Sequence, residues 1–145
     1  MSQEKQANYD DNNIFAKMLK GEIPYHKVYE DDKTLAFMDI MPQAKGHVLI
    51  IPKQQAVDLA DLEPEFATAV LMTAKKVMAA QRQVFEREGI IQMQLNGSEA
   101  GQTVFHYHLH LIPSSIHELG RHAVTQADQT ELANMAKQLA AAIAT

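Results

Sequence analysis

The stretch "GQTVFHYHLHLIP", residues 101–113, holds three of the chain's seven histidines at alternating positions, His106, His108 and His110. Aromatic or aliphatic residues occupy the positions between them. A period of two is typical of a β-strand, because successive side chains of a strand point to opposite faces. We therefore expect the three imidazoles to line one face of a strand and the apolar residues to line the other.

The segments around this strand predict an α+β fold with a mostly antiparallel sheet. The acidic pair Asp31–Asp32 separates two apolar segments and indicates a hairpin, and "HVLIIP" (residues 47–52) predicts another strand. The alternating segment "IIQMQLN" (residues 90–96) and the histidine strand flank the glycine-containing loop "GSEAG". We expect these two strands to pair antiparallel.

Apolar residues at steps of three and four predict one long helix over residues 61–88, ended by Gly89. A second apolar stripe on this helix, formed by Leu71, Met78 and Phe85, either widens the core face or meets a partner subunit.

Shorter helices are predicted over residues 13–20 and from Asp128 or Thr130 onwards. Residues 1–12 are polar, and we expect them to form a flexible N-terminus ahead of a single domain over residues 13–145.

Composition excludes several classes of function. The formal net charge is −5, with 13 basic and 18 acidic residues, so we expect no nucleic-acid partner, which would need a basic surface. No apolar run reaches the roughly 18 residues that span a bilayer, so we expect no membrane partner. The chain has no cysteine and opens without the apolar centre of a secretion signal, which favours a cytoplasmic location.

Three hypotheses account for the histidines. They can be ordinary strand residues, exposed or hydrogen-bonded in the core. They can bind a metal, because three imidazoles and a water form a common catalytic zinc site. They can act on phosphorus, because neutral imidazole is a nucleophile near neutral pH and neighbouring imidazoles can donate to phosphate oxygens. The preceding "GQT", residues 101–103, adds uncharged donors suited to phosphate.

The motif "HYHLHL" resembles the signature of the histidine-triad (HIT) nucleotide-binding family, His-φ-His-φ-His-φ with φ apolar. The blocks "IFAKMLKGEIP", "YEDDKTLAFMDIMPQAKGHVLIIPK" and "NGSEAGQTVFHYHLHLIP" resemble successive blocks of that family over most of residues 13–113. The likeness is greatest to the Hint-type branch, whose members hydrolyse purine nucleoside phosphoramidates and related adenylates. It implies a HIT-like fold, an AMP-type purine nucleotide substrate and a homodimer. We expect no metal and no other cofactor, since the cysteines that bind structural zinc in some bacterial members are missing.

The resemblance also implies roles for individual residues. His108 is the expected nucleophile, which becomes adenylylated, and His106 and His110 flank the α-phosphate, with His110 assisting the leaving group. His47 supports the triad, and Asp39 accepts hydrogen bonds from the ribose hydroxyls, as a carboxylate can. Further residues expected at the nucleotide are Asn96, Gln102 and Thr103 on the phosphate side and Ile14, Phe15, Met18, Ile23, Phe37 and Ile40 around the base.

Two other functions stay open. The chain continues from the triad into Ile112–Pro113, which is nearer to bacterial members and to diadenosine-polyphosphate hydrolases than to animal Hint proteins. A dinucleoside polyphosphate is therefore an alternative substrate. A nucleotide-binding or scaffolding protein with incidental catalysis is the alternative from a different class.

Overall fold

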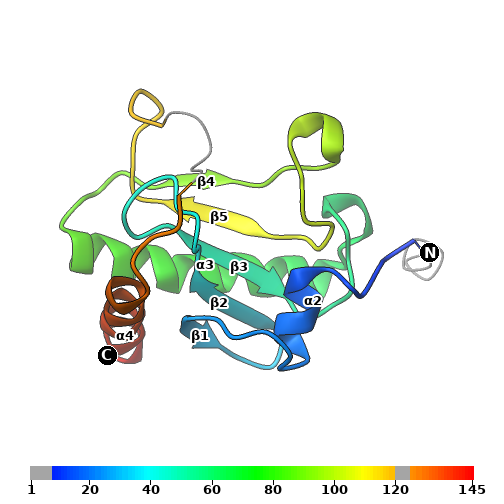
Figure 1. The fold of residues 1–145 in the computed structure, drawn as a ribbon, viewed down its shortest axis with the longest axis horizontal. Helices are drawn as coiled ribbons and strands as arrows, with labels where there is room; N and C mark the ends of the chain where they lie inside the picture. The colour runs from blue at the N-terminus through cyan, green and yellow to red at the C-terminus, as the bar shows by residue number, and fades with distance from the viewer. Residues whose placement is uncertain (1–7, 120–124) are drawn as a thin grey trace.

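The computed structural model describes residues 8–119 and 125–145 and confirms the α+β class (Figure 1). Residues 1–7, which belong to the N-terminus expected to be flexible, lie outside the described residues. Within the described ranges the strands form one sheet in the order β1-β2-β3-β5-β4, and all neighbours pair antiparallel. The strands are β1 (Lys27–Glu30), β2 (Thr34–Met38), β3 (Val48–Pro52), β4 (Ile91–Met93) and β5 (Leu109–Ile112). The predicted hairpin at Asp31–Asp32 and the predicted pairing of β4 with β5 are both confirmed.

Helices cover both faces of this sheet. The helices α3 (Pro64–Phe85) and α4 (Gln129–Ala144) pack on one face, and the short α2 (Ile14–Leu19) packs on the other (Figure 1). Alternation along the strands serves the two sides: Ile50 and Leu109 belong to the core under α3, whereas Phe37 and Leu49 pack with Phe15 of α2. Strands β2 and β3 are buried along their whole length, which explains their nearly continuous apolar sequences.

The long helix is shorter than predicted at both ends. Gly89 does not end it: α3 stops at Phe85, and Glu86 takes the left-handed conformation, with φ 51°, that glycine usually supplies after a helix. Asp61 lies before α3, in a separate 3-10 helix, η1 (Leu59–Asp61), where its carboxylate accepts the Val57 and Asp58 N–H groups. Pro64 occupies the first turn of α3, where a missing N–H leaves no helical hydrogen bond unmade.

The histidine strand is also shorter than predicted. Strand β5 begins at Leu109, so His106 and His108 lie in the segment just before it, outside the regular ladder. One hydrogen bond, from the Tyr107 N–H to the Ala56 carbonyl (2.8 Å), holds this segment beside the chain that follows β3. The predicted separation of faces still holds, because Tyr107 and Leu109 are buried in the core under α3 while Phe15 of α2 packs on His106 and His108.

The second apolar stripe of α3 divides between core and surface. Met78 and Phe85 pack against the core, whereas Leu71 is 51% exposed. At the other predicted helix, Asp128 caps α4 by accepting the Glu131 N–H at 3.0 Å. None of the helices in the described ranges combines the length and the apolar character needed to cross a lipid bilayer.

Candidate active site

A cavity of about 330 Å³ opens beside α2, on the face of the sheet that α2 covers. The helix begins where it does because Asn13 caps it, its side chain accepting the Ala16 N–H at 2.9 Å. Nine of the residues predicted from the sequence line this cavity: Ile14, Phe15, Met18, Ile23, Phe37, Asp39, Ile40, Thr103 and His108. An apolar wall, one carboxylate and one imidazole therefore face the same space.

His108 is held with a defined nitrogen available for chemistry. Its Nδ1 lies 2.7 Å from the backbone carbonyl of His106, and a carbonyl can only accept, so Nδ1 carries the ring proton. The lone pair of the neutral ring is therefore on Nε2. Burial lowers the pKa of His108, against the opposing effects of its hydrogen bond to the His106 carbonyl and of the Asp39 charge. The neutral, nucleophilic form is favoured near neutral pH as a result.

His106 is fully buried, and both of its ring nitrogens are engaged within the protein. Nε2 donates to the Pro52 carbonyl at 2.8 Å, and Nδ1 is hydrogen-bonded to the Tyr9 hydroxyl. Burial lowers the pKa of His106 to about 4, so the ring is neutral at neutral pH. This arrangement differs from the expectation that His106 flanks the phosphate, because the ring has no nitrogen left to donate. The backbone carbonyl of His106 accepts the Nδ1–H of His108.

His110 and His47 form a buried, hydrogen-bonded pair. Nε2 of His47 lies 2.9 Å from Nδ1 of His110, and the backbone N–H of Gln43 donates to Nδ1 of His47 at 3.0 Å. Asp39 lies beside this pair, with Oδ2 3.4 Å from Nε2 of His47 and Oδ1 accepting the Met41 N–H at 2.8 Å. His47, which we expect to support the triad, thus contacts both His110 and Asp39.

Asp39, His47 and His110 are also the described residues whose geometry fits a metal ion. One candidate ligand atom from each lies within 4.8 Å of the others. Hydrogen bonding accounts for the same closeness, because His47 and His110 share a 2.9 Å contact.

The structure does not bring Asn96 or Gln102 into the cavity lining. The side-chain oxygen Oδ1 of Asn96 accepts the Leu59 N–H at 2.9 Å, which ties the β4 end to η1. Gln102 is buried, and its side chain accepts the Gly97 N–H at 2.8 Å and donates to the carbonyls of Val57 (2.7 Å) and Val104 (3.1 Å). Both side chains hold loops together, whereas Thr103, next in sequence to Gln102, faces the cavity.

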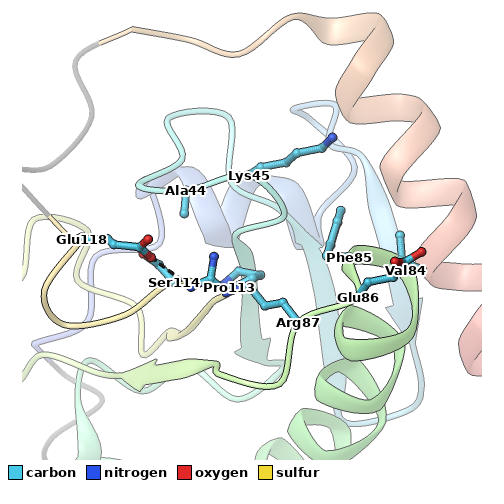
Figure 2. Close-up of a pocket in the computed structure, with 9 residues that line it drawn as sticks. All are labelled: Ala44, Lys45, Val84, Phe85, Glu86, Arg87, Pro113, Ser114 and Glu118. Carbon is cyan, nitrogen blue, oxygen red and sulfur yellow. Dashed lines mark hydrogen bonds and ion pairs between the residues drawn. The ribbon is translucent and has the colours of Figure 1, made fainter.

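A larger cavity, of about 550 Å³, lies at the C-terminal end of α3 (Figure 2). It contains none of the predicted site residues, and its charged groups have mixed sign. Arg87 is paired with Glu118 at 2.9 Å, and Ser114 is within hydrogen-bond distance of the same carboxylate. Its lining is Ala44, Lys45, Val84, Phe85, Glu86, Arg87, Pro113, Ser114 and Glu118. Because Asp39, Thr103 and His108 converge on the smaller cavity, the smaller cavity is the candidate site.

Sequence reasoning missed several residues of this region. Tyr9, which contacts His106, lies in the polar segment expected to be flexible, and its one signal is that it is the single aromatic residue among residues 1–12. The Pro52 carbonyl, which fixes the His106 ring, carries no side-chain signal at all. Six apolar or aromatic lining residues were also missed: Pro24, Tyr25, Met38, Met41, Leu49 and Val104.

Comparison with known proteins identifies the family. The HIT domain model matches residues 20–117. The chain is 44% identical over 103 residues to Protein hit of Bacillus subtilis, and the match covers 71% of each chain. It is 37% identical over 128 residues to adenosine 5'-monophosphoramidase HNT1 of Candida albicans, and that match covers 86% of this chain and 84% of the other. A crystal structure of a Hit-like protein from Bartonella henselae is 42% identical and superposes with a TM-score of 0.85, covering 92% of this chain and 98% of the other. This chain therefore belongs to the HIT family.

Proposed function

We propose that this protein hydrolyses adenosine and other purine nucleoside phosphoramidates, or related adenylates, through a covalent nucleotidyl intermediate on His108. One observation carries the proposal: His108, with its lone pair on Nε2, and the Asp39 carboxylate line the same cavity of about 330 Å³. Apolar walls suit a purine base, and a carboxylate suits the two vicinal hydroxyls of a ribose.

The chain is a hydrolase of the HIT family, as its similarity to proteins named adenosine 5'-monophosphoramidase supports. The choice of phosphoramidate as substrate follows the names of these relatives. The chemistry of the site supports the covalent step, because a buried neutral imidazole with an available nitrogen is an effective nucleophile.

In the first step, Nε2 of His108 forms a bond to the α-phosphorus while the bond from phosphorus to the leaving nitrogen breaks. The leaving nitrogen takes up one proton. We assign the supply of that proton to the hydrogen-bonded pair of His47 and His110 when the pair carries one extra proton, a positive charge that the neighbouring Asp39 carboxylate stabilises; after the transfer both rings are neutral. Thr103, on the cavity wall, is placed to donate to a phosphate oxygen.

In the second step, water attacks the phosphorus and the bond to Nε2 of His108 breaks. The hydroxyl of the water joins AMP, and its remaining proton returns to the pair of His47 and His110. One water is consumed, one amine and one AMP are released, and the enzyme regains its starting state. No metal takes part in this scheme.

We also propose a homodimer. Strand β4 is at the edge of the sheet among the described residues, and an unpaired strand edge can pair with a second chain. Leu71 and Met72, adjacent on the outer surface of α3, are 51% and 53% exposed, and together they give this helix an apolar surface that a second copy would cover.

The experiment offers the purified protein adenosine phosphoramidate, lysine-linked AMP and diadenosine tetraphosphate side by side, with and without prior dialysis against a chelator. We expect the two phosphoramidates to show the highest kcat/KM and the chelator to leave it unchanged. Preference for the tetraphosphate would make the protein a dinucleoside polyphosphate hydrolase. AMP binding without turnover of any of the three would make it a nucleotide-binding protein, and loss of activity on chelation would place a metal in the site.

A further inference from the structure

Tyr9 contacts the triad from a segment that the scheme above does not use. Its hydroxyl is hydrogen-bonded to Nδ1 of His106, and the two rings meet edge to face with centroids 5.6 Å apart. Phe15 packs edge-on against the same imidazole at 6.4 Å. Aromatic rings from two neighbouring parts of the chain therefore enclose His106.

The hydrogen bond between Tyr9 and His106 has a definite direction. Because Nε2 of His106 donates to the Pro52 carbonyl, Nδ1 of the neutral ring can only accept. The Tyr9 hydroxyl is therefore the donor. Burial raises the pKa of the Tyr9 phenol, so the hydroxyl keeps its proton at neutral pH.

The position of His106 matters for His108 through the backbone. The His106 carbonyl accepts the Nδ1–H of His108 at 2.7 Å, and this contact decides that the His108 lone pair is on Nε2. The segment that contains both histidines lies outside the regular ladder of β5, and the peptide that carries this carbonyl has one backbone hydrogen bond, from the Tyr107 N–H to the Ala56 carbonyl. The two ring contacts of His106, to Pro52 and to Tyr9, hold the residue on both sides.

Tyr9 is itself held by a turn that leads into α2. The Asp10 carbonyl accepts the side-chain N–H of Asn13 at 2.8 Å, and the Asp10 carboxylate accepts the Asn12 N–H at 3.0 Å. Lys20 donates to the Asp11 carbonyl at 3.1 Å. This turn thus connects Tyr9 to α2, the helix that carries Phe15.

We propose that Tyr9 is a positioning residue, whose hydroxyl holds the His106 ring and, through the His106 carbonyl, keeps Nε2 of His108 available to the substrate. The inference rests on the proposed function, in which His108 is the nucleophile, and adds a residue from the N-terminal segment to that machinery.

The test compares Tyr9→Phe, which removes only the hydroxyl, with Tyr9→Ala, which also removes the ring. Tyr29→Phe is the control, because the Tyr29 hydroxyl is also hydrogen-bonded within the protein, to Asp31 and Lys76, but lies outside the site. Nitrogen-15 NMR of labelled histidine reports the protonation and hydrogen bonding of each ring nitrogen without substrate. Steady-state kinetics on adenosine phosphoramidate report kcat and KM.

In Tyr9→Phe we expect the Nδ1 resonance of His106 to move and the His108 ring to lose its single tautomer. We expect kcat to fall about tenfold, which is the effect of losing one hydrogen bond, while KM stays nearly unchanged. The control should match the wild type in both measurements. An unchanged His106 resonance in Tyr9→Phe would overturn the proposal. Full turnover by Tyr9→Phe together with a defect in Tyr9→Ala would also overturn it, because the Tyr9 ring would then act by packing and its hydroxyl would have no role. If the wild type itself has no turnover, the proposed function fails, and the resonances still decide whether Tyr9 holds the two rings.

Discussion

The backbone N–H of Gln43 and the Nδ1 atom of His110 bind opposite nitrogens of the His47 ring, at 3.0 and 2.9 Å. An N–H can only donate, so Nδ1 of His47 accepts and its ring proton is on Nε2 when the ring is neutral. That proton is donated to Nδ1 of His110. A neutral His110 then carries its own proton on Nε2, which gives the site a donor of defined orientation next to His108, whose ring centroid is 5.1 Å from that of His110.

Replacing His110 should slow the reaction in a way that depends on the leaving group. We expect His110→Ala to lower kcat on adenosine phosphoramidate by roughly a hundred- to ten-thousand-fold, the usual worth of general acid catalysis. The loss should shrink for an AMP ester of a nitrophenol, since a phenolate leaves without a proton. His47→Ala should show the same leaving-group dependence with a smaller loss, because it acts through His110. Equal losses on both substrates would show that His110 does not deliver a proton.

Asp39 should determine the preference for ribose. We expect Asp39→Ala to weaken AMP binding by about 1.5–3 kcal/mol, the worth of hydrogen bonds to a charged group, with little effect on deoxy-AMP. Asp39→Asn is the conservative comparison, because its amide oxygen can still accept the Met41 N–H that Oδ1 accepts in the wild type. Calorimetric titration with both nucleotides measures the ratio of affinities. If that ratio stayed the same in both variants, the carboxylate would not be the ribose contact.

Burial of neutral His106 should make the protein less stable in acid. The pKa of a histidine is 6.5 when unperturbed and about 4 for His106 in the fold, so between these values the unfolded chain binds more protons. The free energy of unfolding should therefore fall as pH decreases through this window, by about 3 kcal/mol from His106. Urea unfolding at about pH 7 and about pH 4 measures the change.

His106→Gln isolates this effect from the titration of carboxylates. It should be less stable than the wild type at neutral pH and lose less stability on acidification. His117→Gln replaces an exposed histidine and should keep the pH dependence of the wild type. A His106→Gln protein with the full acid sensitivity of the wild type would mean that other groups cause it.

Local patterns in the sequence predicted the site's framework well. The two-residue period separated the histidines from Tyr107 and Leu109, and the helix predicted over residues 13–20 is α2, which places Phe15 on the cavity wall. These features depend on residues close in the chain or on the faces of one element, and short-range patterns record them directly.

Features that arise from contacts between distant segments were not predictable in the same way. Tyr9 and His106 are 97 residues apart, and nothing in the polar N-terminal sequence indicates where that ring packs. The Gln102 side chain is hydrogen-bonded to three backbone groups in nearby loops. The residue type alone does not tell whether a glutamine side chain binds such backbone groups or a phosphate. The end of α3 at Phe85 likewise depends on the next residue, Glu86, which takes the left-handed conformation although it is not glycine.

The proposed dimer should be visible in solution. The chain mass is 16.2 kDa, and we expect sedimentation at micromolar concentration to give about twice that value. Leu71→Glu should shift the protein towards the monomer, because it places a charge on the exposed surface of α3. Ala141, which is exposed on α4 beside β1 at the opposite edge of the sheet, offers the control, and Ala141→Glu should remain dimeric. A wild-type species of single-chain mass would contradict the proposal.

His108 provides the decisive test of the covalent mechanism. His108→Ala removes the nucleophile and should reduce turnover to background, while AMP still binds because Asp39 and the apolar wall remain. Rapid quenching of the wild type with adenosine phosphoramidate, followed by mass spectrometry, should find AMP on His108 and not on His106, whose ring nitrogens are both engaged. A substrate with a chiral phosphorothioate should react with net retention, because two successive in-line displacements each invert the phosphorus. Net inversion would require water to attack the substrate directly, and substantial turnover by His108→Ala would lead to the same conclusion.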